Sequence, residues 1–207
     1  MRHGAQDPGS RPHRPWRNVA DRHGTHCQEN LRRLLGFSGD ATTNDHGIDE
    51  RILQWAGTDF RSVGAIVDLP SQHTRTISPL AYVDCWGVRR DIIDGEWQIT
   101  QYPLRGASLD ELSTFQWPAA RVDEKLLKQW ENRARELRQE NQYVVVGEHP
   151  VYGILELGCW MCGYDDFLLK LADDPDFVRA FFDKVLEIQL AIVDQYYPVL
   201  GPYIDKS

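Results

Sequence analysis

The sequence predicts an α/β protein built around a parallel sheet. Three observations support this fold class. In the second half of the chain, helical patterns alternate with short apolar runs, which is typical of strand–helix–strand units. Two of these runs, 63–69 and 143–147, are rich in valine and isoleucine, as expected for strands covered on both faces. A third strand-like segment, 201–205, closes the 207-residue chain.

The first helices are predicted from apolar spacing and from the residues that end them. Segments 30–36 and 49–57 both finish at a glycine, a residue that favours helix termination. Segment 110–117 reads as a short helical turn ending before a proline. Segment 123–139 places its apolar residues at helical spacing on one face and its charges elsewhere, so we expect a longer amphipathic helix there.

Two further helices are expected nearer the C-terminus. Segment 154–171 is mostly apolar and reads as one helix broken at Gly163. Asp174 followed by Pro175 supplies an N-cap and a proline at the first helical position. The helix that starts there should run to about Tyr197 and stop before the next proline, with an apolar stripe that packs in the core.

The region between residues 82 and 100 carries a different signal. Asp94-Gly95 separates two β-prone runs, 91–93 and 97–100, and this dipeptide is a strong predictor of a β-hairpin. We therefore expect an antiparallel excursion here instead of a simple parallel unit.

Composition limits the functions to consider. The net charge of −8, from 31 acidic and 23 basic residues, argues against a nucleic-acid partner. No apolar run approaches the roughly 18 residues of a membrane helix, and the four cysteines are too sparse for a disulfide framework. We expect a soluble, cytoplasmic protein with no membrane contact. Residues 1–20 predict a disordered basic tail, and residues 21–207 one partial barrel domain.

Three ordered groups of residues resemble the uroporphyrinogen decarboxylase superfamily, in its divergent prokaryotic branch near the corrinoid methyltransferases. They span roughly residues 30 to 205. The matching segments are Leu34-Leu35-Gly36 with Gly57-Thr58-Asp59-Phe60-Arg61, then Asp84-Cys85-Trp86-Gly87 with Tyr102-Pro103-Leu104, and finally Leu155-Glu156 with Gly163-Tyr164-Asp165-Asp166-Phe167-Leu168 and Asp174-Pro175.

The resemblance implies a (β/α)8 TIM barrel, of which this chain would carry the N-terminal part and remain incomplete. It implies a tetrapyrrole or corrinoid-linked substrate. The reaction would be a decarboxylation of porphyrin biosynthesis, which needs no cofactor, or a cobalamin-dependent methyl transfer to a thiol, in which zinc activates the acceptor. The zinc ligands of such a methyltransferase would lie beyond Ser207, so no metal site is expected within this chain. Ser78 and Cys159 stand where true decarboxylases carry aspartate and tyrosine.

Five residues form the predicted site. Asp84 and Glu156 are the candidate catalytic carboxylates; a turn-forming aspartate and an ion-paired or capping glutamate are the structural alternatives. Trp86 and His149 are candidate substrate-binding residues because they follow strand-like runs, and Cys159 is a third because the resemblance places it at the position of the family's active-site tyrosine. For Cys159, which forms a C-x-x-C with Cys162, burial in the core is the stronger expectation.

Other residues and readings carry less weight. Arg89, Arg90 and Arg105 have the chemistry to hold substrate carboxylates, but we expect them in solvent. The His23–Cys27 segment has metal-type residues without a rigid frame. An alternative reading of the whole chain is a catalytically inactive fragment, or one half of a split barrel that needs a complementing chain; a homodimer is also considered.

Overall fold

The structure is a computed structural model, and it describes residues 27–40, 43, 47–64, 67–140, 142–148 and 152–205. The expected tail over residues 1–20 lies outside the described residues. Helical structure covers 27–34. The remaining elements are, in order, α2 Glu50–Trp55, β1 Phe60–Val63, β2 Arg75–Ser78, β3 Ala81–Val83, β4 Arg89–Ile93, β5 Glu96–Gln101, α3 Leu109–Thr114, α4 Glu124–Glu140, β6 Val144–Gly147, α5 Ile154–Cys162, α6 Tyr164–Asp173 and α7 Pro175–Leu200.

The protein is a mixed α/β structure with two sheets. Strands β1 and β6 form a parallel pair in which Phe60 faces Val144 and Val63 faces Gly147. The other four strands form an antiparallel sheet in the order β2-β3-β4-β5. Among the described residues the strands do not close into a barrel. The α/β class and the parallel pairing expected from the sequence are therefore confirmed.

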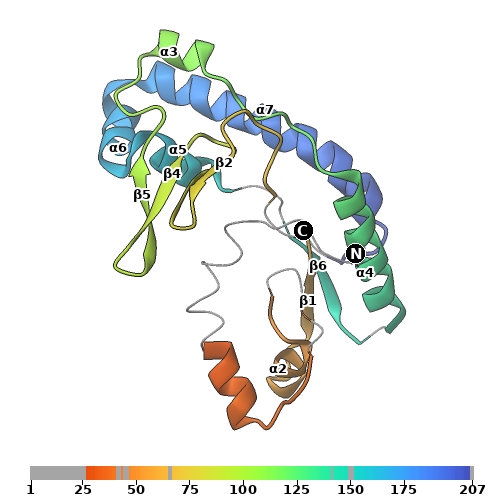
Figure 1. The fold of residues 1–207 in the computed structure, drawn as a ribbon. Helices are drawn as coiled ribbons and strands as arrows, with labels where there is room; N and C mark the ends of the chain where they lie inside the picture. Colours follow the sequence, from red (N-terminus) through yellow and green to blue (C-terminus); the bar gives the residue numbers. More distant parts are fainter. Residues whose placement is uncertain are drawn as a thin grey trace, which may run out of the picture.

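Helices cover one side of the parallel pair. Figure 1 shows α4 and the C-terminal part of α7 lying together beside β1 and β6, while the antiparallel sheet, α5 and α6 gather near the start of α7. Val145 is buried on the covered side, whereas Val144 is 37% exposed on the other. The expectation that these strands are covered on both faces is thus wrong for the described chain.

The antiparallel hairpin is confirmed at its predicted turn. Asp94 has φ 54° and Gly95 φ 88°, so both central residues lie in the left-handed region that a type I′ turn requires. The turn joins β4 to β5, which pair from Arg89 with Gln101 to Ile93 with Glu96. The whole sheet is inserted between β1 and α4, within one connection of the parallel unit.

Two strand predictions differ in their extent. The strand expected over 63–69 lies earlier, at Phe60–Val63, and Val67 and Leu69 are buried outside any strand. Their apolar character reflects core packing and not pleated pairing. Segment 201–205 is a turn, but its end lies against β6: the Asp205 N–H donates to the Val145 carbonyl at 2.8 Å, and the Asp205 carboxylate accepts from the Val145 N–H at 2.9 Å.

The last helix is longer than predicted. Pro175 occupies its first turn, and the Asp174 side chain caps it by accepting from the Phe177 N–H, as expected. The helix then passes through Pro198 to Leu200. Tyr196 and Leu200 are both buried, and the Gly201 N–H donates to the Tyr197 carbonyl at 2.8 Å, so packing and this bond hold the final turn despite the donor that proline removes.

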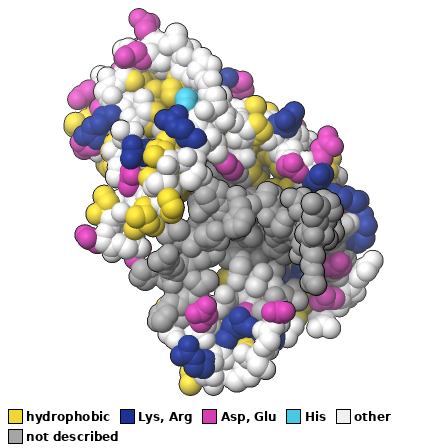
Figure 2. Space-filling view, viewed as in Figure 1, with side chains coloured by type: hydrophobic (Ala, Val, Ile, Leu, Met, Phe, Trp, Pro, Cys, Tyr) yellow, Lys and Arg dark blue, Asp and Glu magenta, His cyan; other side chains and the backbone are white. Residues whose placement is uncertain are grey.

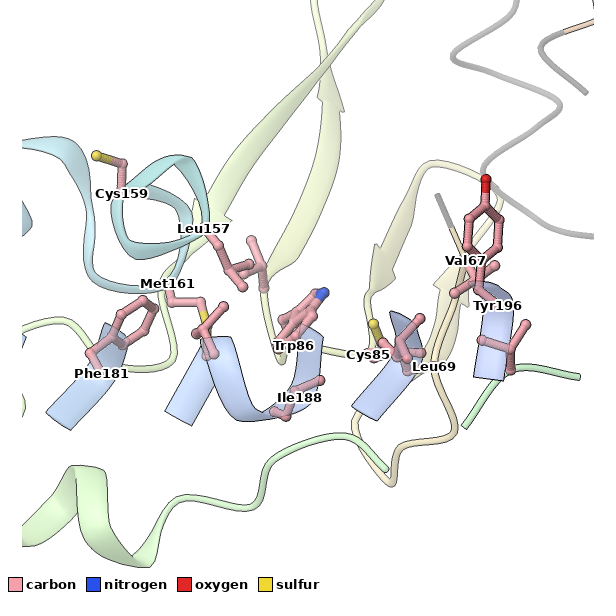
Figure 3. Close-up of a cluster of buried hydrophobic side chains, with 14 of the residues drawn as sticks. Val67, Leu69, Cys85, Trp86, Leu157, Cys159, Met161, Phe181, Ile188 and Tyr196 are labelled. Atoms are coloured by element: carbon pink, nitrogen blue, oxygen red, sulfur yellow. The ribbon is translucent and has the colours of Figure 1, made fainter. Parts of the chain in front are cut away.

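The core runs along α7 and joins both sheets to the helices. Figure 3 shows Trp86 between Leu157 of α5 and Ile188 of α7. Leu69, from the segment after β1, and Cys85, from the turn after β3, lie beside a different part of α7. Gly158 permits the close packing of α5 on α6, because a Cβ there would lie 2.2 Å from the Phe167 ring. Within the described residues, no helix combines the length and apolar character needed to cross a bilayer.

Candidate functional site

The candidate site lies in the two connections that leave the carboxyl ends of β1 and β6. The antiparallel sheet belongs to the connection after β1, and α5 belongs to the connection after β6. Ligand sites of parallel α/β proteins lie at this edge, because the connections that follow the strands converge there. In this protein the two connections meet around Asp84 and Arg90, which we call the Asp84–Arg90 cluster; its other members are Tyr82, Tyr152 and Trp160.

The carboxylate of Asp84 stabilises a backbone turn and also pairs with the guanidinium of Arg90. Its Oδ1 accepts hydrogen bonds from the backbone N–H groups of Trp86 and Val88, each at 3.0 Å. Its Oδ2 forms a short ion pair with Arg90. Gly87 closes the turn with φ 84°, in the region that favours glycine. Both carboxylate oxygens are therefore engaged within the protein.

Arg90 links the sheet to α5. Its side chain is only 13% exposed, and its Cζ lies 5.0 Å from the centre of the Trp160 ring. Burial alone lowers the pKa of this guanidinium, but the negative charge of Asp84 and the nearby Tyr82 outweigh that effect, so the pKa is raised. Arg90 thus stays charged and is held between a carboxylate and an aromatic face.

Two tyrosines complete the cluster. Tyr82 packs edge-on against Trp97 with ring centres 4.8 Å apart, and Tyr152 packs the same way against Trp160 at 4.6 Å. Burial raises the pKa of Tyr82, and it raises the pKa of Tyr152 to about 12. Both hydroxyls are protonated at neutral pH, so the cluster combines a fixed cation with two hydrogen-bond donors on aromatic walls.

The predicted site residues are distributed unevenly around this cluster. Asp84 lies at its centre. Trp86 is 2% exposed and packs in the core, with its ring centre 6.4 Å from that of Trp117. Glu156 is exposed in the first turn of α5, and Cys159 is buried on the same helix, with its sulfur directed away from Trp86 in Figure 3. His149 lies outside the described residues.

The expectation for the arginines was wrong in one case. Arg90 is only 13% exposed and is paired with Asp84, whereas Arg89 and Arg105 lie nearer the surface in pairs with Asp91 and Asp165. The available signal was the alternation of β4, which turns Arg89 and Arg90 to opposite faces of the sheet. Tyr152 and Trp160 are not predicted as site residues, since nothing local in the sequence places them beside β4.

The cysteines are free thiols, and burial affects their acidity. Burial raises the pKa of Cys159, and the negative charge of Glu156 raises that pKa further. Burial also raises the pKa of Cys162, to about 12. All four cysteines are free thiols. In the described part of the chain, no three His, Cys, Asp or Glu side chains are grouped so as to hold a metal ion.

Comparison of the chain with protein-family models, with curated proteins and with solved structures gives no match.

Proposed function

We propose that this chain is the N-terminal part of a (β/α)8 barrel of the uroporphyrinogen decarboxylase type, and that it acts on a tetrapyrrole or corrinoid-linked substrate. One structural observation is the main support for the proposal. The two connections that follow the parallel strands β1 and β6 are the ones that bear the Asp84 and Glu156 motifs, and they meet at the Asp84–Arg90 cluster. A barrel enzyme assembles its site from these same connections.

The chemistry of the cluster supports an anionic, aromatic substrate. A guanidinium fixed by Asp84, with protonated Tyr82 and Tyr152 beside it, offers donors to the carboxylates carried by porphyrin precursors. The rings of Trp160 and Trp97 add flat apolar walls. Asp84 has both oxygens engaged, so in this proposal it orients Arg90, and an exposed carboxylate such as Glu156 is the better candidate for proton transfer.

The two reactions of the proposal place different demands on the site. Decarboxylation needs a pocket carboxylate to stabilise the protonated pyrrole as CO2 leaves, and it needs no cofactor. Methyl transfer to a thiol needs zinc, and among the described residues no three His, Cys, Asp or Glu side chains are grouped so as to hold a metal ion. The carboxylate-binding character of the Asp84–Arg90 cluster favours the first reaction.

The test is a binding and turnover measurement on the full chain. Uroporphyrin, the stable oxidised form of the decarboxylase substrate, should quench the fluorescence of the tryptophans near the cluster. An Arg90→Gln variant should weaken this binding about tenfold, as loss of one charge-assisted contact predicts. Incubation with uroporphyrinogen should then yield products with fewer carboxylates; methylcobalamin with a thiol, with and without zinc, tests the other reaction. The proposal would be refuted if the chain bound neither uroporphyrin nor a cobalamin.

A second candidate is a non-catalytic half of a split barrel. The observation that favours it is the uncovered face of the parallel pair, where Phe60 is 60% and Val144 37% exposed. Parallel strands normally have both faces covered. In this case the chain should gain porphyrin turnover only when mixed with a polypeptide that carries the remaining strands. Full activity of the isolated chain as a monomer would exclude this candidate.

A further inference from the structure

A hollow of about 850 Å³ lies between the segment that follows β1 and the start of α4. Residues 67–71 and Thr74 form one wall, residues 121–127 form the other, and Gln195 of α7 lies at its base. This volume falls within the range of small-molecule sites in proteins.

The floor of the hollow is apolar and well fixed. Val67, Leu69, Val122 and Leu127 are each less than 10% exposed. Gln195 anchors one side of the floor to α7, because its Oε1 accepts from the Val122 N–H at 3.1 Å and its Nε2 donates to the Ala120 carbonyl at 2.7 Å. An apolar group entering here would meet a surface that is already ordered.

The rim carries two cations that have no acid partner. The side chains of Arg121 and Lys125 make no hydrogen bond or ion pair with any residue that the structure describes, although most other basic side chains there are paired. Two nearby acids are engaged elsewhere: Asp123 caps α4 by accepting from the Lys125 N–H at 2.8 Å and the Leu126 N–H at 3.1 Å, and Asp68 accepts from the Thr74 hydroxyl at 3.3 Å.

Glu124 is the remaining acid on the rim, and it is exposed. It disfavours ligands with several separated negative charges. The best fit is a molecule whose single compact anion lies between Arg121 and Lys125 while its body covers the apolar floor.

We propose that this hollow is a binding site for a small organic carboxylate with an apolar body of one or two rings. The ring system would lie on Val67, Leu69 and Val122, and the carboxylate would accept hydrogen bonds from Arg121 and Lys125. None of the lining residues belongs to the Asp84–Arg90 cluster, and the inference does not depend on the proposed porphyrin chemistry.

The probe is 2-naphthoate, compared with its neutral amide and with inorganic phosphate, by calorimetric titration of the full chain. Naphthoate should bind more tightly than either. A double variant, Arg121→Gln with Lys125→Gln, should raise its Kd about tenfold or more. The matched control changes two other exposed cations, Arg33→Gln with Arg179→Gln, which alters net charge equally but leaves the rim intact. This control should change the Kd by no more than about twofold, because salt screens distant charges.

A third variant checks the location independently of charge. Thr74→Trp places a large side chain at the mouth of the hollow from an exposed position, where it should block naphthoate without unfolding the protein. Circular dichroism of each variant confirms that the fold is retained. Equal binding of naphthoate and its amide, an equal loss in the two double variants, or unchanged binding in Thr74→Trp would each overturn the proposal. Binding of phosphate as tight as naphthoate would also overturn it, because the apolar floor would then contribute nothing.

Discussion

The guanidinium of Arg90 lies over the indole of Trp160, with its Cζ 5.0 Å from the ring centre, and so couples the antiparallel sheet to the helix that follows β6. The two residues are separated by two strands and two helices in the sequence, yet they meet beside the carboxylate of Asp84. This contact holds the candidate site together, and removing it should have a measurable cost.

Replacing Arg90 with glutamine should destabilise the protein strongly. Asp84 and Arg90 are 15% and 13% exposed, so the variant leaves a largely buried carboxylate without its partner. We expect the free energy of unfolding to fall by about 2–4 kcal/mol, measured by urea denaturation. Arg89→Gln is the control, because the pair between Arg89 and Asp91 is more exposed and should cost less than about 1 kcal/mol. Equal losses in the two variants would contradict this account of the cluster.

Acid should weaken the packing of α2 through Asp49. This carboxylate is 1% exposed, and its hydrogen bonds from Arg51, with the nearby Arg32, hold its pKa below the ordinary value of 3.8. A lowered folded-state pKa stabilises the protein fully above the unfolded pKa, and this contribution is lost as pH falls through the folded pKa. The free energy of unfolding should therefore decline below about pH 4, and it should decline less steeply in Asp49→Asn. Parallel pH profiles of the two proteins would show that Asp49 does not contribute.

A methyl group at position 158 should disrupt the contact between α5 and α6. The Cβ of an alanine there would lie 2.2 Å from the Phe167 ring, which is itself fully buried. We expect Gly158→Ala to lower the free energy of unfolding by about 1–3 kcal/mol. Gly153→Ala is the matched control at the start of the same helix, where nothing lies within 4 Å, and it should cost about 0.5 kcal/mol. A neutral Gly158→Ala would mean that the two helices are packed less closely than described.

The C-x-x-C pair should be chemically inert in the folded protein. Burial raises the pKa values of Cys159 and Cys162, and both thiols are buried. Cys27 is exposed and serves as an internal control. On treatment with iodoacetamide at neutral pH, mass spectrometry should find Cys27 alkylated first, and the other two modified at comparable rates only after denaturation. Rapid native modification of Cys159 would instead favour a reactive role for this residue.

Local signals in the sequence predicted local structure well. The Asp94-Gly95 turn, the cap at Asp174 and the break at Gly163 are each specified by the conformational or hydrogen-bonding needs of a few adjacent residues. The parallel pairing of β1 and β6 also agreed with the alternation of helices and strands. These features depend on interactions within a short stretch, or on a pattern that the sequence displays directly.

Predictions that depended on long-range packing were less complete. The apolar run at 63–69 predicts a strand, but Val67 and Leu69 are buried by contacts with the core and not by pairing. Glu156 belongs to the mostly apolar segment 154–171, yet its side chain is exposed on α5. The cluster around Arg90 depends on Tyr152 and Trp160, which come from a different connection, so no local pattern could have brought them together.

Asp205 has a consequence for how the outer edge of β6 can pair. Its N–H and its carboxylate together occupy the carbonyl and the N–H of Val145, while Arg138 pairs with the same carboxylate. These two hydrogen bonds to a single residue fix the alignment of Asp205 along β6. The alignment matters because a slip by one residue would turn every side chain of a neighbouring strand to the opposite face. Asp205 therefore sets the register in which a further backbone segment can pair with that edge of β6.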